Sequence, residues 1–115
     1  MQHDCIFCKI ASKEIPVKAV YEDEHMLAFP DINPVAPVHL LVIPKRHISN
    51  LLEVHSSDGE LLAHIMTTIP KIATEAGLSE EGFRLVINTK RHGGQTVDHL
   101  HWHVLGGRHM EWPPG

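Results

Sequence analysis

The chain has 115 residues, 43% of them hydrophobic, and fourteen Asp and Glu outnumber ten Lys and Arg to give a formal charge of −4. This composition is typical of a globular protein, and we expect a single domain over residues 1–115. The negative charge offers no long-range attraction to nucleic acid, which argues against such a partner. No apolar run approaches the roughly 20 residues of a membrane span, and the first five residues lack the features of a secretory signal, so we predict a cytoplasmic protein.

The first half of the chain predicts short elements around one rigid loop. In chain order we expect a short helix over 5–10, strands over 17–22 and 26–29, a loop over 30–37, a strand over 39–43 and a helical turn over 50–54. The acidic turn Asp23-Glu24 joins the first two strands into a hairpin. Three prolines stiffen the loop, which can be neither helix nor central strand, and stiff loops often position a ligand.

One long helix dominates the second half. Ser57 followed by Glu60 is typical of a capping box, apolar residues then recur at helical spacing, and Gly77 is a natural stop. Pro70 lies inside this pattern and removes a backbone donor, so we expect a bend near Met66. A strand over 83–88, a loop over 89–94 and a histidine strand over 99–105 follow.

These elements predict an α+β fold. Consecutive strands at hairpin distances favour an antiparallel sheet of about five strands, with the main helix covering one side and a short helix at the N-terminus. In the last strand, histidine alternates with apolar residues at the period of a half-buried strand. One face therefore carries His99, His101 and His103, and the other directs Leu100, Trp102 and Val104 into the core.

The three histidines invite metal or phosphorus chemistry. Alternate residues on a strand lie about 6.8 Å apart, whereas zinc needs each nitrogen at about 2.0–2.1 Å, so the three imidazoles cannot easily share one ion. A neutral imidazole can instead attack phosphorus and form a covalent intermediate. Gly94, Gln95 and Thr96 precede the strand and could donate hydrogen bonds to phosphate oxygens. The alternative is a solvent-facing polar strand without a task.

The chain contains two cysteines, Cys5 and Cys8, in a Cys-x2-Cys pattern. In a cytosolic protein this spacing indicates half of a zinc site or a redox pair more than a structural disulfide. The alternative is a pair of small buried thiols, because free cysteine is among the most buried residue types. Nothing in the strand and helix pattern supports the redox pair.

The segment His99-Leu100-His101-Trp102-His103-Val104-Leu105 resembles the signature of the histidine triad (HIT) nucleotide hydrolases and transferases. The resemblance covers nearly the whole chain. Matching segments include Lys13-Glu14-Ile15-Pro16, Val42-Ile43-Pro44-Lys45, Gly93-Gly94-Gln95-Thr96-Val97, Gly106-Gly107-Arg108 and Trp112-Pro113-Pro114-Gly115. The last two are similar to the Hint branch, the purine nucleoside phosphoramidases.

The resemblance implies a role for each matching residue. His101 would be the nucleophile that takes the nucleoside monophosphate from a P–N bond, and His103 would hydrogen-bond the α-phosphate. His39 would support the triad by hydrogen bonding, and Asp31 would accept from the ribose hydroxyls. Gln95 and Thr96 would lie near the leaving group, with Asn88 and Gly94 completing the phosphate cradle. Ile6, Phe7, Phe29 and Ile32 would sandwich the purine, although such residues are also commonly plain core.

The resemblance also implies a structural zinc site and a homodimer. Zinc would be bound by Cys5, Cys8, His47 and His99, a tetrahedral set without an open coordination position, and no catalytic metal would be needed. The expected ligands are purine nucleoside monophosphates and phosphoramidates. Two other functions stay open: a dinucleoside polyphosphate hydrolase, and a zinc-stabilised nucleotide-binding interaction module whose turnover is incidental.

Overall fold

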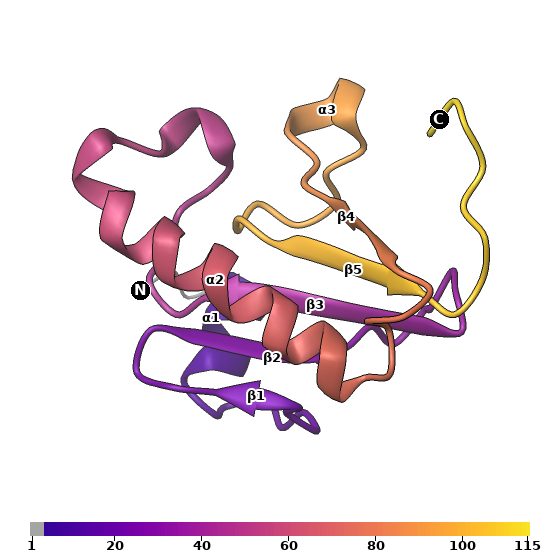
Figure 1. Ribbon diagram of the computed structural model, residues 1–115. Helices are drawn as coiled ribbons and strands as arrows, with labels where there is room; N and C mark the ends of the chain where they lie inside the picture. Colours follow the sequence, from indigo (N-terminus) through magenta and orange to yellow (C-terminus); the bar gives the residue numbers. More distant parts are fainter. Residues whose placement is uncertain (1–3) are drawn as a thin grey trace.

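A computed structural model describes residues 4–115, and the first three residues of the segment considered for a signal sequence lie outside that range. Five antiparallel strands form one sheet in the order β1-β2-β3-β5-β4 (Figure 1). The strands are β1 Tyr21–Glu22, β2 Met26–Pro30, β3 Val38–Pro44, β4 Phe83–Val86 and β5 Trp102–Gly106. The helices are α1 Ile6–Ala11, α2 Gly59–Glu75 and α3 Lys90–Gly93, with 3₁₀ turns at Leu51–Glu53 and Ser56–Asp58. The predicted α+β fold is confirmed.

The two faces of the sheet carry different helices. On one face, Ile65, Ile69 and Ile72 of α2 pack against residues such as Val42 and Trp102 of the central strands. On the other face, α1 supplies a second apolar cluster with β2 and β3, built from Phe7, Ile10, Leu27, Phe29, Leu41 and Ile43. The prediction that only one side is covered was therefore incomplete. Figure 1 shows α1 and α2 on opposite sides of β2 and β3.

The histidine strand is shorter than predicted. β5 begins at Trp102, so His99 and His101 lie before the strand and only His103 lies within it. The reason is visible at the end of β3, where Pro44 has no N–H and its carbonyl accepts the imidazole of His99 at 2.8 Å. The backbone N–H of Leu100 then bonds to Ile48 instead of to a ladder partner. Leu100, Trp102 and Val104 are nevertheless buried in the α2 core, as predicted.

The main helix also differs from its prediction at the start. The Ser57 capping box is wrong, because Ser57 lies in a 3₁₀ turn and α2 begins at Gly59. The carboxylate of Asp58 instead accepts the backbone N–H of His55 at 2.9 Å and pairs with Arg46. The helix runs through Pro70 as one element and ends before Gly77, whose φ of 83° fits the predicted stop.

Three further boundaries moved. β1 is only two residues long, and β4 ends at Val86, which pairs with His103 of β5. The predicted loop over 89–94 contains the short helix α3.

Within residues 4–115, no helix is both long enough and apolar enough to cross a membrane.

Candidate functional site

The three histidines of the triad have different surroundings. The side chain of His99 is fully buried, His101 is 4% exposed, and His103 is half-buried on β5. His103 pairs with Leu41 in the sheet register, which places it on the same face as α1. The rings of His101 and His103 lie side by side with centroids 4.9 Å apart.

The hydrogen bond of His101 determines which of its nitrogens is free. Nδ1 lies 2.7 Å from the carbonyl oxygen of His99, so Nδ1 carries the proton and donates it. Nε2 then holds a lone pair. It has no hydrogen-bond partner within residues 4–115 and is not completely buried, so it remains accessible to a small ligand. Burial lowers the pKa of His101, which keeps the ring neutral near pH 7.

A chain of hydrogen bonds orients His103 in the opposite sense. The backbone N–H of Val35 donates to Nδ1 of His39 at 3.1 Å, so the proton of His39 is on Nε2. His39 Nε2 then donates to Nδ1 of His103 at 2.9 Å. His103 must therefore carry its own proton on Nε2. The two neighbouring rings present complementary groups: a lone pair on His101 and an N–H donor on His103.

Asp31 lies beside this chain. One of its oxygens is 3.3 Å from His39 Nε2, and the other accepts the backbone N–H of Asn33 at 2.8 Å. Burial lowers the pKa of His39, and it lowers that of His103 to about 4 with further repulsion from His101 and His39. Asp31, His39 and His103 are close enough to be considered as metal ligands. The proton on His39 Nε2 argues against that use.

A second cluster lies at the other end of the triad. Cys5, Cys8, His47 and His99 place their ligand atoms within 4.8 Å of one another, so these four residues could hold a metal ion. A tetrahedral zinc with ordinary Zn–S and Zn–N lengths separates its sulfur and nitrogen ligands by about 3.5 Å. Three of the four sulfur to nitrogen distances are 3.3 Å for Cys5–His99, 3.3 Å for Cys8–His47 and 3.6 Å for Cys8–His99. The donor set and its spacing therefore fit zinc.

The surroundings of the cluster prepare these side chains for a cation. His99 donates through Nε2 to the carbonyl of Pro44, which leaves Nδ1 unprotonated toward both thiols. Burial lowers the pKa of His99 to about 4 and raises the pKa of the Cys5 thiol. The imidazole is thus already in its ligand form, whereas the Cys5 thiolate needs a neighbouring positive charge.

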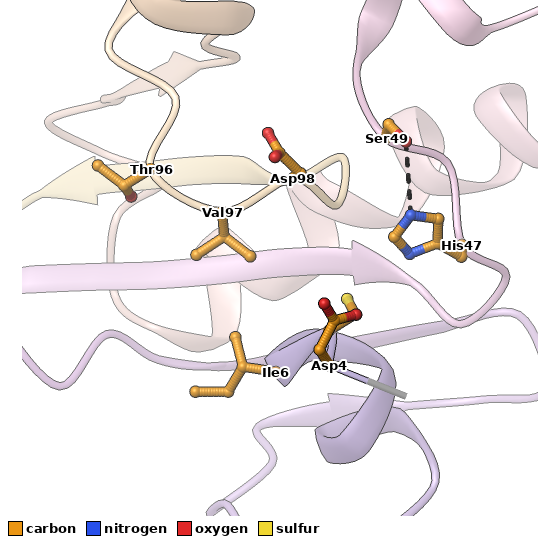
Figure 2. A pocket seen from close by; sticks show the side chains of 8 residues that line it. Asp4, Ile6, His47, Ser49, Thr96, Val97 and Asp98 are labelled. Atoms are coloured by element: carbon orange, nitrogen blue, oxygen red, sulfur yellow. Dashed lines mark hydrogen bonds between the residues drawn. The ribbon is translucent and has the colours of Figure 1, made fainter. Parts of the chain in front are cut away.

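A cavity of about 430 Å³ opens beside this cluster (Figure 2). Its walls include Ile6 and Thr96, two of the residues predicted for the nucleotide, and Cys5 and His47 of the cluster. Asp4 and Asp98 add acidic groups to the rim, and Ser49 and Val97 complete it. The cavity therefore borders both predicted sites.

The structure distributes the other predicted nucleotide residues unevenly. Ile32 is 90% exposed and Ile6 is about half exposed, whereas Phe7 and Phe29 are 6% and 4% exposed and pack edge to face on each other. In this conformation the two phenylalanines mainly build the core. Gly94 and Thr96 are exposed, and Asn88 is half-buried. The purine contact of these residues stays a prediction.

Two participants were missed by sequence reasoning. Val35 sets the tautomer of His39 through its backbone N–H, and Ser49 accepts the side chain of Gln95 through its backbone carbonyl. Every non-proline residue carries both groups, so no side-chain pattern in the sequence could reveal these roles.

Comparison with known families defines the class of protein. The family model of the HIT domain matches residues 12–110. The chain therefore belongs to the HIT family, and the matched range includes the three histidines described above. Cys5 and Cys8 lie outside the matched residues.

Individual relatives agree with this assignment. An uncharacterized HIT-like protein of Synechococcus elongatus is 56% identical over 115 residues and covers all of both chains. A crystal structure of a HIT family hydrolase from Legionella pneumophila Philadelphia 1 has a TM-score of 0.95 and 55% identity, covering 97% of this chain and 100% of that one. A histidine triad protein from Clostridium difficile has a TM-score of 0.93 and 48% identity, covering 96% of each chain.

Proposed function

We propose that this HIT-family protein is a nucleotide hydrolase that cleaves the P–N bond of purine nucleoside 5′-phosphoramidates. The main support is the complementary pair of tautomers, with a lone pair on His101 Nε2 next to an N–H donor on His103. A relative named as a hydrolase shares the whole fold, which agrees with the proposed class of reaction.

The proposed reaction has two steps. His101 Nε2 forms a bond to the α-phosphorus, the P–N bond breaks, and the amine leaves with a proton taken from water. Water then attacks the phosphorus, the bond from phosphorus to Nε2 breaks, and the nucleoside monophosphate leaves the neutral imidazole; the proton that this water gives up neutralises the hydroxide left by the first step. His103 Nε2–H would donate to a phosphate oxygen as charge develops in the transition state. Asp31 would accept from the ribose diol.

The metal cluster has a supporting part in this proposal. Zinc held by Cys5, Cys8, His47 and His99 would have four protein ligands, and it would supply structural stability and not chemistry at phosphorus. His99 belongs to the cluster through its side chain and holds His101 through its carbonyl oxygen at 2.7 Å. The cluster would thereby fix the backbone that orients the nucleophile.

A trapped intermediate tests the proposal directly. Protein mixed with adenosine 5′-phosphoramidate and quenched with denaturant at alkaline pH, where a P–N bond to imidazole survives, should gain the mass of one adenosine monophosphate unit on the peptide that contains His101. Release of adenosine monophosphate should be faster from this substrate than from a dinucleoside polyphosphate. Faster cleavage of the polyphosphate would favour the P–O–P hydrolase, and neither turnover nor adduct at saturating substrate would favour a binding module.

A further inference from the structure

The side-chain amide of Gln95 is fully engaged inside the protein. Its Nε2 donates to the carbonyl oxygens of Ser49 at 2.7 Å and Val97 at 2.9 Å, which uses both amide hydrogens. Its Oε1 accepts the backbone N–H of Lys90 at 2.9 Å. The partners determine the orientation of the amide, since two are acceptors and one is a donor. No hydrogen of this amide is left to donate to a ligand.

Gln95 and Lys90 are joined twice. Besides the side-chain bond, the backbone N–H of Gln95 donates to the carbonyl oxygen of Lys90 at 3.0 Å. These two bonds close a ring over residues 90–95, which includes Gly93 and Gly94. Lys90 has a φ of 58°, a left-handed conformation that costs a residue with a Cβ roughly 1–2 kcal/mol. The two hydrogen bonds to Gln95 hold the backbone of Lys90 in this unfavourable conformation.

The hydrogen bond from Gln95 to Ser49 connects this ring to the cluster of candidate metal ligands. Ser49 is two residues after His47, and its hydroxyl lies 3.4 Å from His47 Nε2. Gln95 therefore bridges the loop that carries Gly94 and Thr96 to the segment that carries a cluster histidine. Ser49, Thr96 and His47 also line the same cavity (Figure 2).

We propose that Gln95 is a positioning residue that holds the loop over residues 90–97 in its reactive conformation and does not contact the leaving amine. This inference rests on the proposed phosphoramidate hydrolysis, and it changes the role that the resemblance implies for Gln95. Its amide fixes the places of Gly94 and Thr96, which are exposed and free to meet the phosphate. A side chain that shapes a loop affects all substrates alike, whereas one that stabilises a departing amine affects poor leaving groups most.

The first experiment compares leaving groups. Gln95→Met keeps the length of the side chain and removes its three hydrogen bonds. We expect kcat/KM to fall about 10–100-fold by the same factor for adenosine 5′-phosphoramidates of weakly and strongly basic amines. Gln95→Glu keeps an acceptor for Lys90 but places a carboxylate against two carbonyls, and it should lose a similar factor. A loss that grows with amine basicity would show contact with the leaving group and overturn the proposal.

The second experiment uses the left-handed residue. Lys90→Gly removes the cost of the positive φ, so in the Gln95→Met background it should recover about tenfold in kcat/KM while changing the wild type little. Lys90→Ala removes the same charge but keeps the strain, and it is the matched control that should recover nothing. Equal recovery by Gly and Ala would assign the effect to charge and would contradict the proposal that Gln95 holds the backbone of Lys90.

A third measurement does not depend on turnover. Hydrogen exchange of the Lys90 amide should be slow in the wild type and at least tenfold faster in Gln95→Met, with amides of β3 unchanged. Unchanged exchange at Lys90 would overturn the positioning role even if hydrolysis is demonstrated. Altered exchange in a protein that does not cleave phosphoramidates would support the positioning role of Gln95 and contradict the proposed function, so the two failures are distinguishable.

Discussion

The two faces of the central sheet use alternate residues of the same strands for different purposes. On the α2 face, Trp102 and Val104 of β5 join the apolar core. On the α1 face, the apolar cluster under β2 and β3 gives way to His101 and His103 toward β5. The imidazoles there are buried enough to have lowered pKa values, and each is oriented through Nδ1: His101 donates to the carbonyl of His99, and His103 accepts from His39. Alternation thus lets one strand provide both packing and chemistry.

The α2 face has one polar exception. Within residues 4–115, Trp102 Nε1 is the buried side-chain polar atom without a hydrogen-bond partner. An unmade hydrogen bond of this kind costs about 1–3 kcal/mol, which the large buried area of the indole offsets. The α1 face instead uses hydrogen bonds to Nδ1 of His101 and His103 to orient both rings, and within residues 4–115 it leaves Nε2 of each without a partner. Packing dominates one face and hydrogen bonding the other.

The largest predicted effect separates chemistry from packing. His101→Ala removes the proposed nucleophile, and we expect kcat to fall at least about 10³–10⁴-fold. The free energy of unfolding should fall by about 1–3 kcal/mol, because the carbonyl oxygen of His99 loses its hydrogen-bond partner. Steady-state kinetics and urea unfolding measure these two quantities. A variant with near-normal turnover would contradict the assignment of the nucleophile.

The next effect concerns the cluster at the end of the α1 face. The double variant Cys5→Ser/Cys8→Ser should lose bound zinc, from about one ion per chain to nearly none by elemental analysis. Its thermal midpoint should fall well below that of the wild type, because a metal that binds only the folded protein adds its binding free energy to the free energy of unfolding. Wild-type protein that is fully stable without metal and indifferent to a chelator would refute this prediction.

A matching change on the α2 face should do the opposite of His101→Ala. Ile69 is buried in the α2 core, and Ile69→Ala should lower the free energy of unfolding by about 2–5 kcal/mol. At a temperature where the variant is folded, we expect kcat to stay within a factor of about two. The space left by the missing side chain of Ile69 lies across the sheet from the histidines. Chemical denaturation and kinetics on the same sample provide the comparison. A large loss of kcat in the folded variant would show that the faces are coupled.

The smallest predicted effect is a pH dependence of stability from the α1 face. Histidine in the unfolded chain has a pKa near 6.5, whereas that of His103 is lowered to about 4 and that of His39 is also lowered. Between these values the unfolded chain binds protons that the folded chain does not, so stability is present above about pH 6.5 and is lost as the pH falls toward 4. Because His103 is partly exposed, we expect a loss of about 1 kcal/mol.

Urea titrations at pH 7.5 and pH 5 measure this term. The double variant His39→Phe/His103→Phe keeps ring-sized side chains without titration, and its stability should depend less steeply on pH. An equal slope in both proteins would assign the pH dependence to other groups.

Periodicity and motifs predicted much of the fold. Alternation correctly assigned Leu100, Trp102 and Val104 to the core, because the two sides of a strand are chemically distinct in any antiparallel sheet. Helix and strand ends were less predictable. The Ser57 capping box failed because Asp58 found partners in His55 and Arg46, which are competing interactions that local spacing does not reveal.

The sequence by itself determined the class of the protein. The strand pattern and the histidine row follow from its periodicity, and the resemblance to the HIT family identified the four candidate metal ligands. Tertiary structure alone decided what separates the three histidines. Cys5 lies 94 residues from His99, yet the fold places their sulfur and nitrogen 3.3 Å apart. The proton positions on His101 and His103 depend on carbonyl and amide groups that every residue shares, so only folding selects which of them face an imidazole.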